Sequence, residues 1–155
     1  MLNLQANGLN EALLRSANPK LYLIAFEPLM LKKTEIKQLE EGDLIQLGKR
    51  LPELYIYRKG SVVGQVALGE ADGREAVIVS AKERITNLGK PEPKYTVLES
   101  RIAILPKEKF IVGKLAYLPS HATEKILLFV KEKVIATARL LEDGEQYFLE
   151  IVEKH

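Results

Sequence analysis

The sequence contains no cysteine and no tryptophan, and aromatic residues occupy only 6% of its 155 positions. Without cysteine, the chain forms no disulfide and uses no thiol chemistry, cysteine-ligated zinc or iron–sulfur cluster. Few aromatic rings leave few stacking surfaces for single-stranded nucleic acid. No apolar run approaches the roughly 18 residues that a membrane-spanning helix needs. Residues 1–14 carry no basic residue and no signal-peptide core, so we expect a soluble, intracellular protein.

The charges are nearly balanced, with 23 basic and 21 acidic residues for a net charge of +2. Neither half of the chain is a basic arm or an acidic tail, so the composition gives little support for binding of nucleic acid. Hydrophobic residues make up 46% of the chain, which is the share of an ordinary globular protein. The length favours one compact domain or two very small ones.

Candidate catalytic groups are scarce. His121 lies in a polar stretch with no second histidine at metal-ligand spacing, and His155 is the last residue. The paired acids Glu70 and Asp72 stand beside a glycine, where carboxylates usually form turns. The glycines form no phosphate-binding loop, and no serine has the setting of a nucleophile elbow. We therefore expect no enzyme activity, no bound cofactor and no metal site.

Most apolar segments have the length of β-strands, so the sequence predicts a mostly β fold. Residues 9–17 are predicted to form a short N-terminal helix, and residues 34–39 one helical turn. Gly89 to Lys94 form the clearest linker, because two prolines and several charges fall within this short stretch. The predicted strands are 21–26, 44–47, 54–57, 62–68, 76–79, 95–98, 102–105, 110–112, 126–130, 134–141 and 147–152.

The two halves of the chain resemble each other. The segment 54–66, a strand, a lysine-containing turn and a strand of small residues, has a counterpart at 126–138, and the offset between the two is constant throughout. Both copies continue to an Asp-Gly pair, at Asp72 and at Asp143, with the second copy one residue shorter. A unit of about 65 residues buries too little surface alone, which favours two copies that cover each other.

The first copy resembles a known domain. Residues 39–47, the hairpin 54–68, and the turn and strand 72–79 are similar to the surface-presentation-of-antigens (SpoA) domain. That domain builds the C-terminal parts of flagellar motor switch proteins and of their counterparts in type III secretion sorting platforms. The chain departs from the family's pattern at Lys59-Gly60, at 64–66 and at 76–79. The second copy is more degenerate, because 113–118 stands where the family has its Gly-Asp element.

The resemblance implies a fold of two small SpoA-like β units, intertwined as a pseudo-dimer, with a short N-terminal helix outside them. We expect an N-terminal segment at 1–19, unit one at 20–88, a linker at 89–94 and unit two at 95–155. The implied function is a non-catalytic scaffold or adaptor of the flagellar motor switch (C-ring) or of a type III secretion platform. Its partners would be other ring or platform subunits, in the cytoplasm at the face of the inner membrane. The sequence leaves open whether the units pair within one chain or between two.

Two groups of residues are candidates for partner binding. Leu9, Ala12 and Leu13 form the predicted apolar face of the N-terminal helix. Val62-Val63 and Val134-Ile135 are adjacent apolar pairs, and one member of each pair must leave its strand's apolar face. Such doubled faces suit either strands buried on both sides or an exposed docking patch.

The sequence leaves two other functions open. A small β-barrel that binds nucleic acid would explain the basic residues and hairpins, although the balanced charge and the scarcity of aromatics argue against it. An enzyme or small-ligand domain would need a deep pocket lined by Glu70, Asp72 or His121.

Overall fold

The computed structural model describes residues 10–15, 20–50, 53–58, 61–82 and 92–155. The chain is mostly β, as the alternation of apolar residues predicts, and residues 10–15 form a short N-terminal helix. The remaining elements in chain order are β1 (Tyr22–Phe26), β2 (Leu29–Lys32), α2 (Lys33–Gln38), β3 (Leu44–Gly48), β4 (Leu54–Arg58), β5 (Ser61–Ala71), β6 (Arg74–Ala81), β7 (Tyr95–Leu105), η1 (Lys107–Lys109), β8 (Leu115–Tyr117), η2 (Ala122–Glu124), β9 (Ile126–Val130), β10 (Lys133–Asp143) and β11 (Gln146–Lys154). No helix in these ranges is long and apolar enough to cross a membrane.

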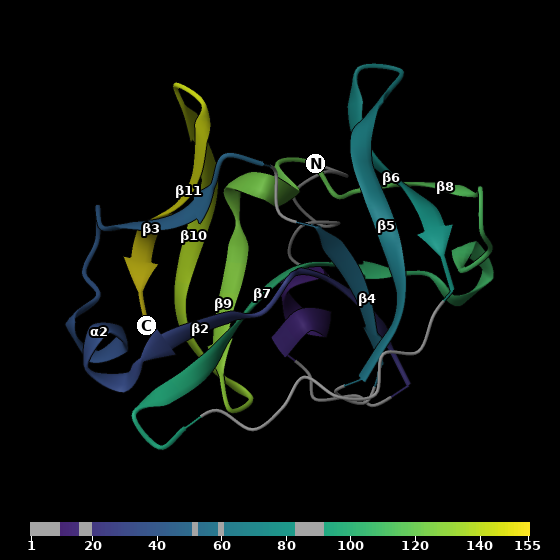
Figure 1. Ribbon diagram of the computed structural model, residues 1–155. Helices are drawn as coiled ribbons and strands as arrows, with labels where there is room; N and C mark the ends of the chain where they lie inside the picture. Colours follow the sequence, from purple (N-terminus) through teal and green to yellow (C-terminus); the bar gives the residue numbers. More distant parts are fainter. Residues whose placement is uncertain (1–9, 16–19, 51–52, 59–60, 83–91) are drawn as a thin grey trace.

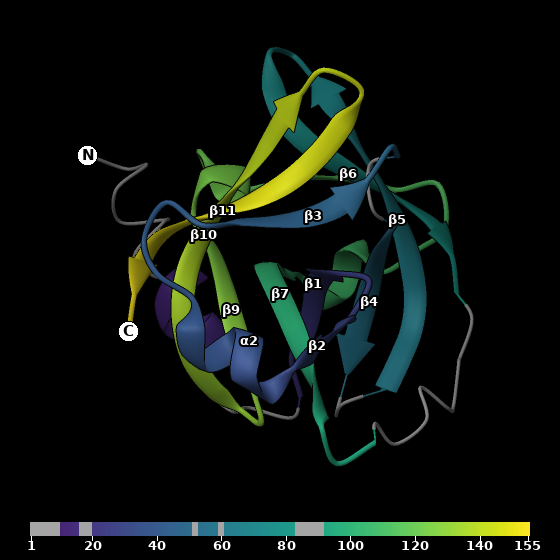
Figure 2. The same cartoon turned by 60° about the vertical axis from the view of Figure 1, so that its left-hand side comes forward.

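The strands form one sheet whose order is symmetric about its centre. The order is β3-β11-β10-β9-β7-β1-β4-β5-β6-β8, with β2 also paired to β7. Strand β3 comes from the first half of the chain but pairs with β11 of the second, and β8 of the second half pairs with β6 of the first. Figures 1 and 2 show β3 against the β10–β11 hairpin, and Figure 1 shows β8 beside β6 on the other side of the molecule. The two halves are therefore intertwined by exchange of an edge strand.

The inner hairpins of the two halves are equivalent residue by residue. Leu54 pairs with Val66 in β4–β5, and Ile126 pairs with Ala138 in β9–β10. Each residue of the second pair follows its counterpart in the first pair by the same number of positions in the sequence. Each hairpin also has a β-bulge at the same place, where Val63 and Ile135 are the extra residues. This shared irregularity supports a duplicated unit better than alternation alone does.

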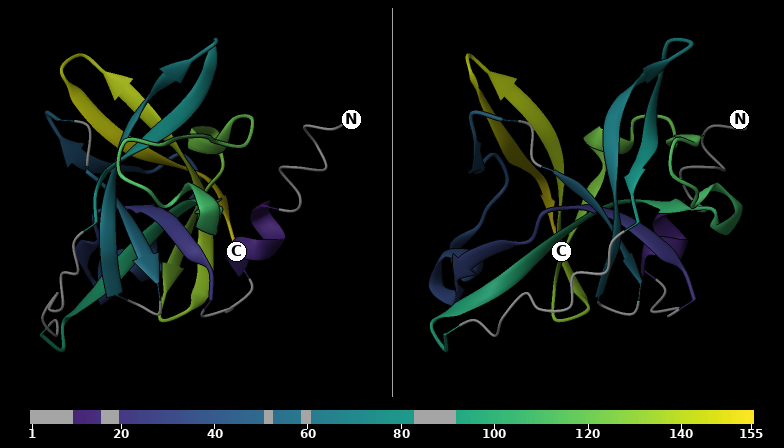
Figure 3. Two further views of the ribbon diagram at one scale, coloured as in Figure 1. Left: turned by 90° about the vertical axis from the view of Figure 1, so that its right-hand side faces the viewer. Right: turned by 45° about the vertical axis from the view of Figure 1, so that its right-hand side comes forward.

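The outer hairpins keep the same offset, which corrects one expectation from the sequence. Ala71 pairs with Arg74 and Asp143 with Gln146, so the second copy is not one residue shorter. The turn residues are Asp72-Gly73 in the first copy and Gly144-Glu145 in the second, which makes Asp143 the end of a strand. Gly144 has a φ of 65° at the first turn position, where glycine is favoured in two-residue hairpins. Figure 3 shows the two outer hairpins rising together and diverging toward their tips.

The pseudo-twofold axis passes between β1 and β7. Ala25 pairs with Tyr55 and Arg101 pairs with Leu127, the residue equivalent to Tyr55, so Ala25 and Arg101 are equivalent. The same two residues also pair directly with each other. A position that pairs with its own equivalent lies on the symmetry axis of the sheet. The offset between equivalent positions is slightly larger in β1 and β7 than in the hairpins.

The turns that precede the exchanged strands are equivalent as well. The N–H of Gly42 donates to the Ile151 carbonyl at 2.8 Å, and the N–H of Gly113 donates to the Val79 carbonyl at 2.7 Å. Both glycines have positive φ, 91° and 88°, a conformation that other residues rarely adopt. The predicted strand at 110–112 is wrong: this segment leads into the turn, and the strand follows at β8. The predicted helical turn at 34–39 is confirmed as α2.

The main core joins both halves of the chain. It contains buried residues from β1, β4, β6, β7, β9 and β11, among them Phe26, Ile56, Ile102 and Leu128. Two smaller clusters lie apart from it, one around Tyr57 and Val62 and one around Leu127 and Phe129. Buried residues of both halves belong to this one cluster, so the sheet is packed as one body. The described parts of 20–88 and 95–155 thus share one core.

Candidate protein-docking surfaces

Exposed apolar side chains gather at one end of the sheet. Ile78, Ile111, Val112 and Tyr117 are four of the seven large hydrophobic residues exposed among the described residues, and their exposed fractions run from 42% to 55%. We call these four residues the β6–β8 end. Ile78 lies opposite Ala67 of β5 and Leu115 of β8, which makes an apolar row across three strands. Exposed apolar surface next to an edge strand is typical of a protein interaction site.

The equivalent end of the other half is charged. The row equivalent to Ala67, Ile78 and Leu115 consists of Arg139, Glu150 and Leu44. Arg139 and Glu150 form an ion pair there. The turn residues equivalent to Ile111 and Val112 are Glu40 and Glu41, as the matched glycine turns require. The pseudo-symmetry therefore separates an apolar end from a charged end on otherwise equivalent scaffolds.

Tyr117 is held in a fixed position at the apolar end. Its hydroxyl donates to Oδ2 of Asp72 at 2.7 Å, and the guanidinium of Arg74 lies 4.5 Å from the centre of its ring. The bond to the Asp72 carboxylate raises the pKa of Tyr117, because the acceptor favours the protonated hydroxyl. These contacts join β8 of the second half to the β5–β6 turn of the first, so the end presents a defined surface.

A second surface is already occupied by the N-terminal helix. Leu14 is 1% exposed and packs on Leu127 and Phe129. The Asn10 side chain bonds the edge of β7 twice, donating to the Ile102 carbonyl at 3.1 Å and accepting from the Ile104 N–H at 3.2 Å. A single amide side chain thus satisfies two backbone groups and fixes the helix against the sheet.

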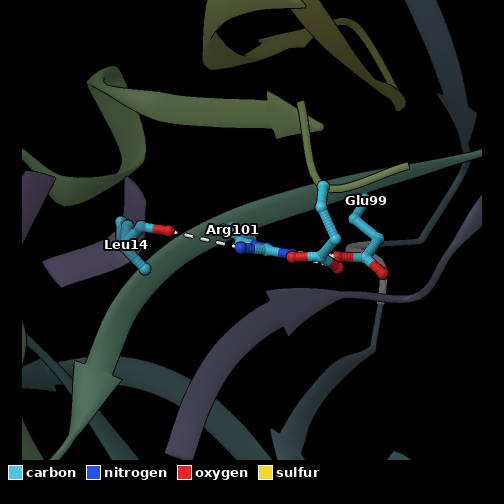
Figure 4. A network of polar contacts seen from close by, with 4 residues as sticks. Leu14, Glu99 and Arg101 are labelled. Atoms are coloured by element: carbon cyan, nitrogen blue, oxygen red, sulfur yellow. Dashed lines mark hydrogen bonds and ion pairs between the residues drawn. The ribbon is translucent and has the colours of Figure 1, made fainter. Parts of the chain in front are cut away.

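Arg101, which lies on the pseudo-twofold axis, also contacts the N-terminal helix. Its guanidinium is nearly buried, donates to the Leu14 carbonyl at 3.2 Å and pairs with Glu99 at 2.9 Å (Figure 4). It also pairs with Glu132 at 3.1 Å and lies 3.9 Å from the centre of the Phe129 ring. The buried charge is therefore compensated by two carboxylates, a carbonyl and an aromatic face. Arg101 ties the helix, β7 and the β9–β10 turn together.

The structure places the predicted partner-binding residues in different surroundings. Leu9 lies outside the described residues, Ala12 is exposed and Leu13 is half-buried. The N-terminal helix buries Leu14, which was not among the predicted residues, because Asn10 turns that face toward β7. These placements leave the role of the helix in binding a partner as a prediction.

The two apolar pairs on β5 and β10 contact both faces of the sheet. Val63 and Ile135 pack against the main core, and Val62 and Val134 belong to the smaller clusters on the other face. Neighbouring residues of a strand point to opposite faces, so each pair is apolar because both faces of the sheet are covered at this point. Val62 is only 1% exposed, so it lies inside its cluster, and the other three are half-buried. Sequence reasoning missed Ile78, Val112 and Tyr117, which a comparison of the two copies at the turn would have distinguished from their polar counterparts.

The acidic and histidine side chains form no group of three or more that could hold a metal within the described residues. Asp72 accepts the bond from Tyr117. The exposed His121 lies 3.1 Å from Glu124. It directly precedes η2 and has a φ of 60°. His155 Nε2 lies 2.8 Å from the Thr137 hydroxyl. No model of a known protein family matches the chain, and no curated protein matches its sequence.

Proposed function

We propose that this chain is a non-catalytic adaptor that binds another protein through the β6–β8 end. The observation that carries the proposal is the apolar character of this end, at Ile78, Ile111, Val112 and Tyr117, where the equivalent end is charged. When a partner covers an apolar surface at an edge strand, the removal of that surface from water lowers the free energy of the complex. The equivalent end supplies the internal comparison, because Glu150, Glu40 and Glu41 stand there at the positions of Ile78, Ile111 and Val112, and Leu44 and Val152 are its exposed apolar residues.

The assembly that we propose for this adaptor is the flagellar motor switch or a type III secretion sorting platform. The similarity of residues 39–79 to the SpoA domain supports this choice. Exchange of edge strands between two equivalent halves is also the arrangement that the resemblance implies. The partners would be other subunits of the ring or platform, at the cytoplasmic face of the membrane.

The test is affinity capture from the native host with three forms of the full chain. The first is the wild type. The second carries Ile78→Glu and Val112→Glu, which introduce the residues that the equivalent positions Glu150 and Glu41 already carry, so the fold should tolerate them. The third carries Leu44→Glu at the opposite end, where Leu44 is 50% exposed.

We expect the wild type and the Leu44→Glu form to recover motor switch or secretion-platform subunits, and the double variant to lose them. Burying charged side chains in a formerly apolar contact reduces affinity by at least an order of magnitude, or about 1.4 kcal/mol. Equal recovery by all three forms would contradict the role of the β6–β8 end. Recovery of nucleic acid in a salt-dependent manner, without these subunits, would support the nucleic-acid-binding alternative instead.

A further inference from the structure

Strand β8 ends the sheet beside β6, and the other side of its backbone has no partner strand (Figure 1). Its inward hydrogen bonds to β6 include those of the Lys114 carbonyl, which accepts at 3.1 Å, and of the Leu118 N–H, which donates at 3.0 Å. Because hydrogen bonds alternate along an antiparallel pair, the N–H and C=O groups of Leu115 and Tyr117 point away from β6. No other described strand pairs with β8, so these four groups have no backbone partner there.

An apolar row of side chains ends at the same edge. Ala67, Ile78 and Leu115 form this row across β5, β6 and β8. Residues that are paired across strands project to the same face, so a residue opposite Leu115 on a further strand would extend the row. Tyr117, whose hydroxyl is bonded to Asp72, would contact the next residue of that strand on this face. The edge therefore offers backbone groups and apolar side chains together.

The equivalent edge strand β3 is flanked by charges, and β8 is not. Charged residues beside an edge strand oppose the addition of another strand, and natural proteins commonly protect free edges in this way. Between residues 110 and 123, Lys114 is the one charged side chain apart from histidine. Of the two edges, that of β8 is therefore the less protected. Residues 40–50, which contain β3, carry five charged side chains, at Glu40, Glu41, Asp43, Lys49 and Arg50.

An extended segment matches this edge better than a helix does. The backbone groups of a helix are bonded within the helix, so a helix would cover Ile78 and leave the outward groups of β8 unpaired. An extended backbone supplies donors and acceptors at the two-residue spacing of Leu115 and Tyr117. The turn at Gly113, with a φ of 88°, and Pro119, which has no N–H, limit the edge on its two sides. The matching segment is therefore short.

We propose that a partner protein adds a short extended segment to β8 as a further strand of the sheet. The proposal rests on the function proposed above for the β6–β8 end and specifies how the partner binds there. Backbone groups of the segment bond to those of Leu115 and Tyr117. Every second residue of the segment is apolar, because it lies on the face of Ile78 and Leu115.

A tethered peptide tests the edge without the native partner. The full chain with Lys114→Cys, its one cysteine, is joined by a disulfide to the peptide Cys-Gly-Gly-Thr-Val-Thr-Val-Thr, whose alternate valines are apolar. The tether raises the effective concentration of the peptide to the millimolar range. We expect amide hydrogen exchange at Leu115 and Tyr117 to slow by about tenfold or more, because both N–H groups gain an acceptor. The Val79 amide, which already donates to the carbonyl of residue 114, should exchange as before.

Two variants of the full chain test the edge in affinity capture. Leu115→Pro removes an N–H that points away from β6, and proline is found on edge strands because such an N–H is not needed for the fold. Leu115→Val keeps the N–H and is the control for the change of side chain. We expect Leu115→Pro to lower the recovery of motor switch or secretion-platform subunits by about tenfold, and Leu115→Val by no more than about twofold. Unchanged exchange at the Val79 amide shows that both variants keep the pairing of β6 and β8.

Two results would overturn the proposal. The first is unchanged exchange at Leu115 and Tyr117 with the tethered peptide, or equal slowing by the same peptide with N-methylated valines, which cannot form the ladder. The second is equal recovery of subunits by Leu115→Pro and Leu115→Val. If Leu115→Pro keeps the subunits and the form with Ile78→Glu and Val112→Glu loses them, the partner binds through side chains alone. If the peptide protects the edge and the wild type captures none of these subunits, the proposed function fails and the edge remains a site for strand addition.

Discussion

At the scale of single residues, the position on the pseudo-twofold axis is used asymmetrically. Ala25 and Arg101 are equivalent and face each other, yet one is the smallest apolar side chain in its cluster and the other is a buried cation. Two arginines meeting on the axis would repel each other, and two alanines would leave a void. The difference lets the second half hold the N-terminal helix through Arg101, whereas Ala25 packs in a buried cluster with Tyr57 and Val62.

The Tyr57 hydroxyl provides a prediction for stability. Tyr57→Phe should raise the free energy of unfolding by about 1 kcal/mol near neutral pH, because it removes a buried hydroxyl that has no partner among the described residues. The raised pKa of Tyr57 also makes stability depend on pH. In the unfolded chain this tyrosine ionises from about pH 10, whereas in the folded chain it stays protonated. The wild type should therefore lose stability above pH 10, and the variant should lose less.

Urea unfolding at pH 8 and at pH 11 measures both effects. Tyr55 has a pKa raised to about 12 by its bond to Glu53 and by burial, so it contributes to the alkaline loss in both forms. An unchanged or lower stability of Tyr57→Phe at pH 8 would show that the hydroxyl has a partner in solution.

At the scale of elements, the hairpins were predictable and the exchange between them was not. The strands at 54–57, 62–68, 126–130 and 134–141 follow from alternation and turn residues, which act over a few positions. The sequence at 44–47 predicts a short strand, but nothing in those residues says that it pairs with β11 rather than with its own hairpin. Pairing between distant segments depends on how the whole sheet closes.

The candidate surfaces were harder to predict than the strands. In the sequence, Ile78 looks like any other apolar residue of a strand. Its exposure depends on whether another element covers its face of the sheet. The segment Phe110 to Val112 reads as a strand because it is apolar, although two of its residues are exposed in a turn. For the N-terminal helix, the spacing of apolar residues predicts that the face with Ala12 and Leu13 is buried. The hydrogen bonds of Asn10 to β7 turn the helix so that Leu14 is buried instead.

The N-terminal helix provides a prediction at this scale. Asn10→Ala should lower the free energy of unfolding by about 1–2 kcal/mol, because the Ile102 carbonyl and the Ile104 N–H both lose a partner. Hydrogen exchange should be faster at the Ile104 amide. The control is Arg15→Ala, whose exposed i,i+4 pair with Glu11 contributes less than about 0.5 kcal/mol. Unchanged exchange at Ile104 would show that the helix does not rest on β7.

At the scale of the whole molecule, duplication and strand exchange explain how so small a unit is stable. The two halves share one core, and each supplies the strand that completes the other's outer hairpin. Symmetry then creates pairs of equivalent surfaces that can diverge in sequence. One such pair is the β6–β8 end and its equivalent at β3 and β11. Equivalent surfaces can acquire different chemical character in this way without a change of fold.

The β6–β8 end and its equivalent both depend on strand exchange within one chain, and engineered disulfides test that exchange. The chain has no cysteine, so any disulfide comes from the introduced pair. One double variant carries Leu44→Cys and Glu150→Cys, which are paired across β3 and β11, and another carries Ile78→Cys and Leu115→Cys across β6 and β8. Cα atoms of antiparallel partners lie about 4.5–5.5 Å apart, within reach of a disulfide.

After oxidation, we expect intact-mass spectrometry to find both variants as monomers with one closed disulfide. Disulfide-linked dimers would show exchange between chains, and unreacted thiols in both variants would show that the edge strands do not pair as described.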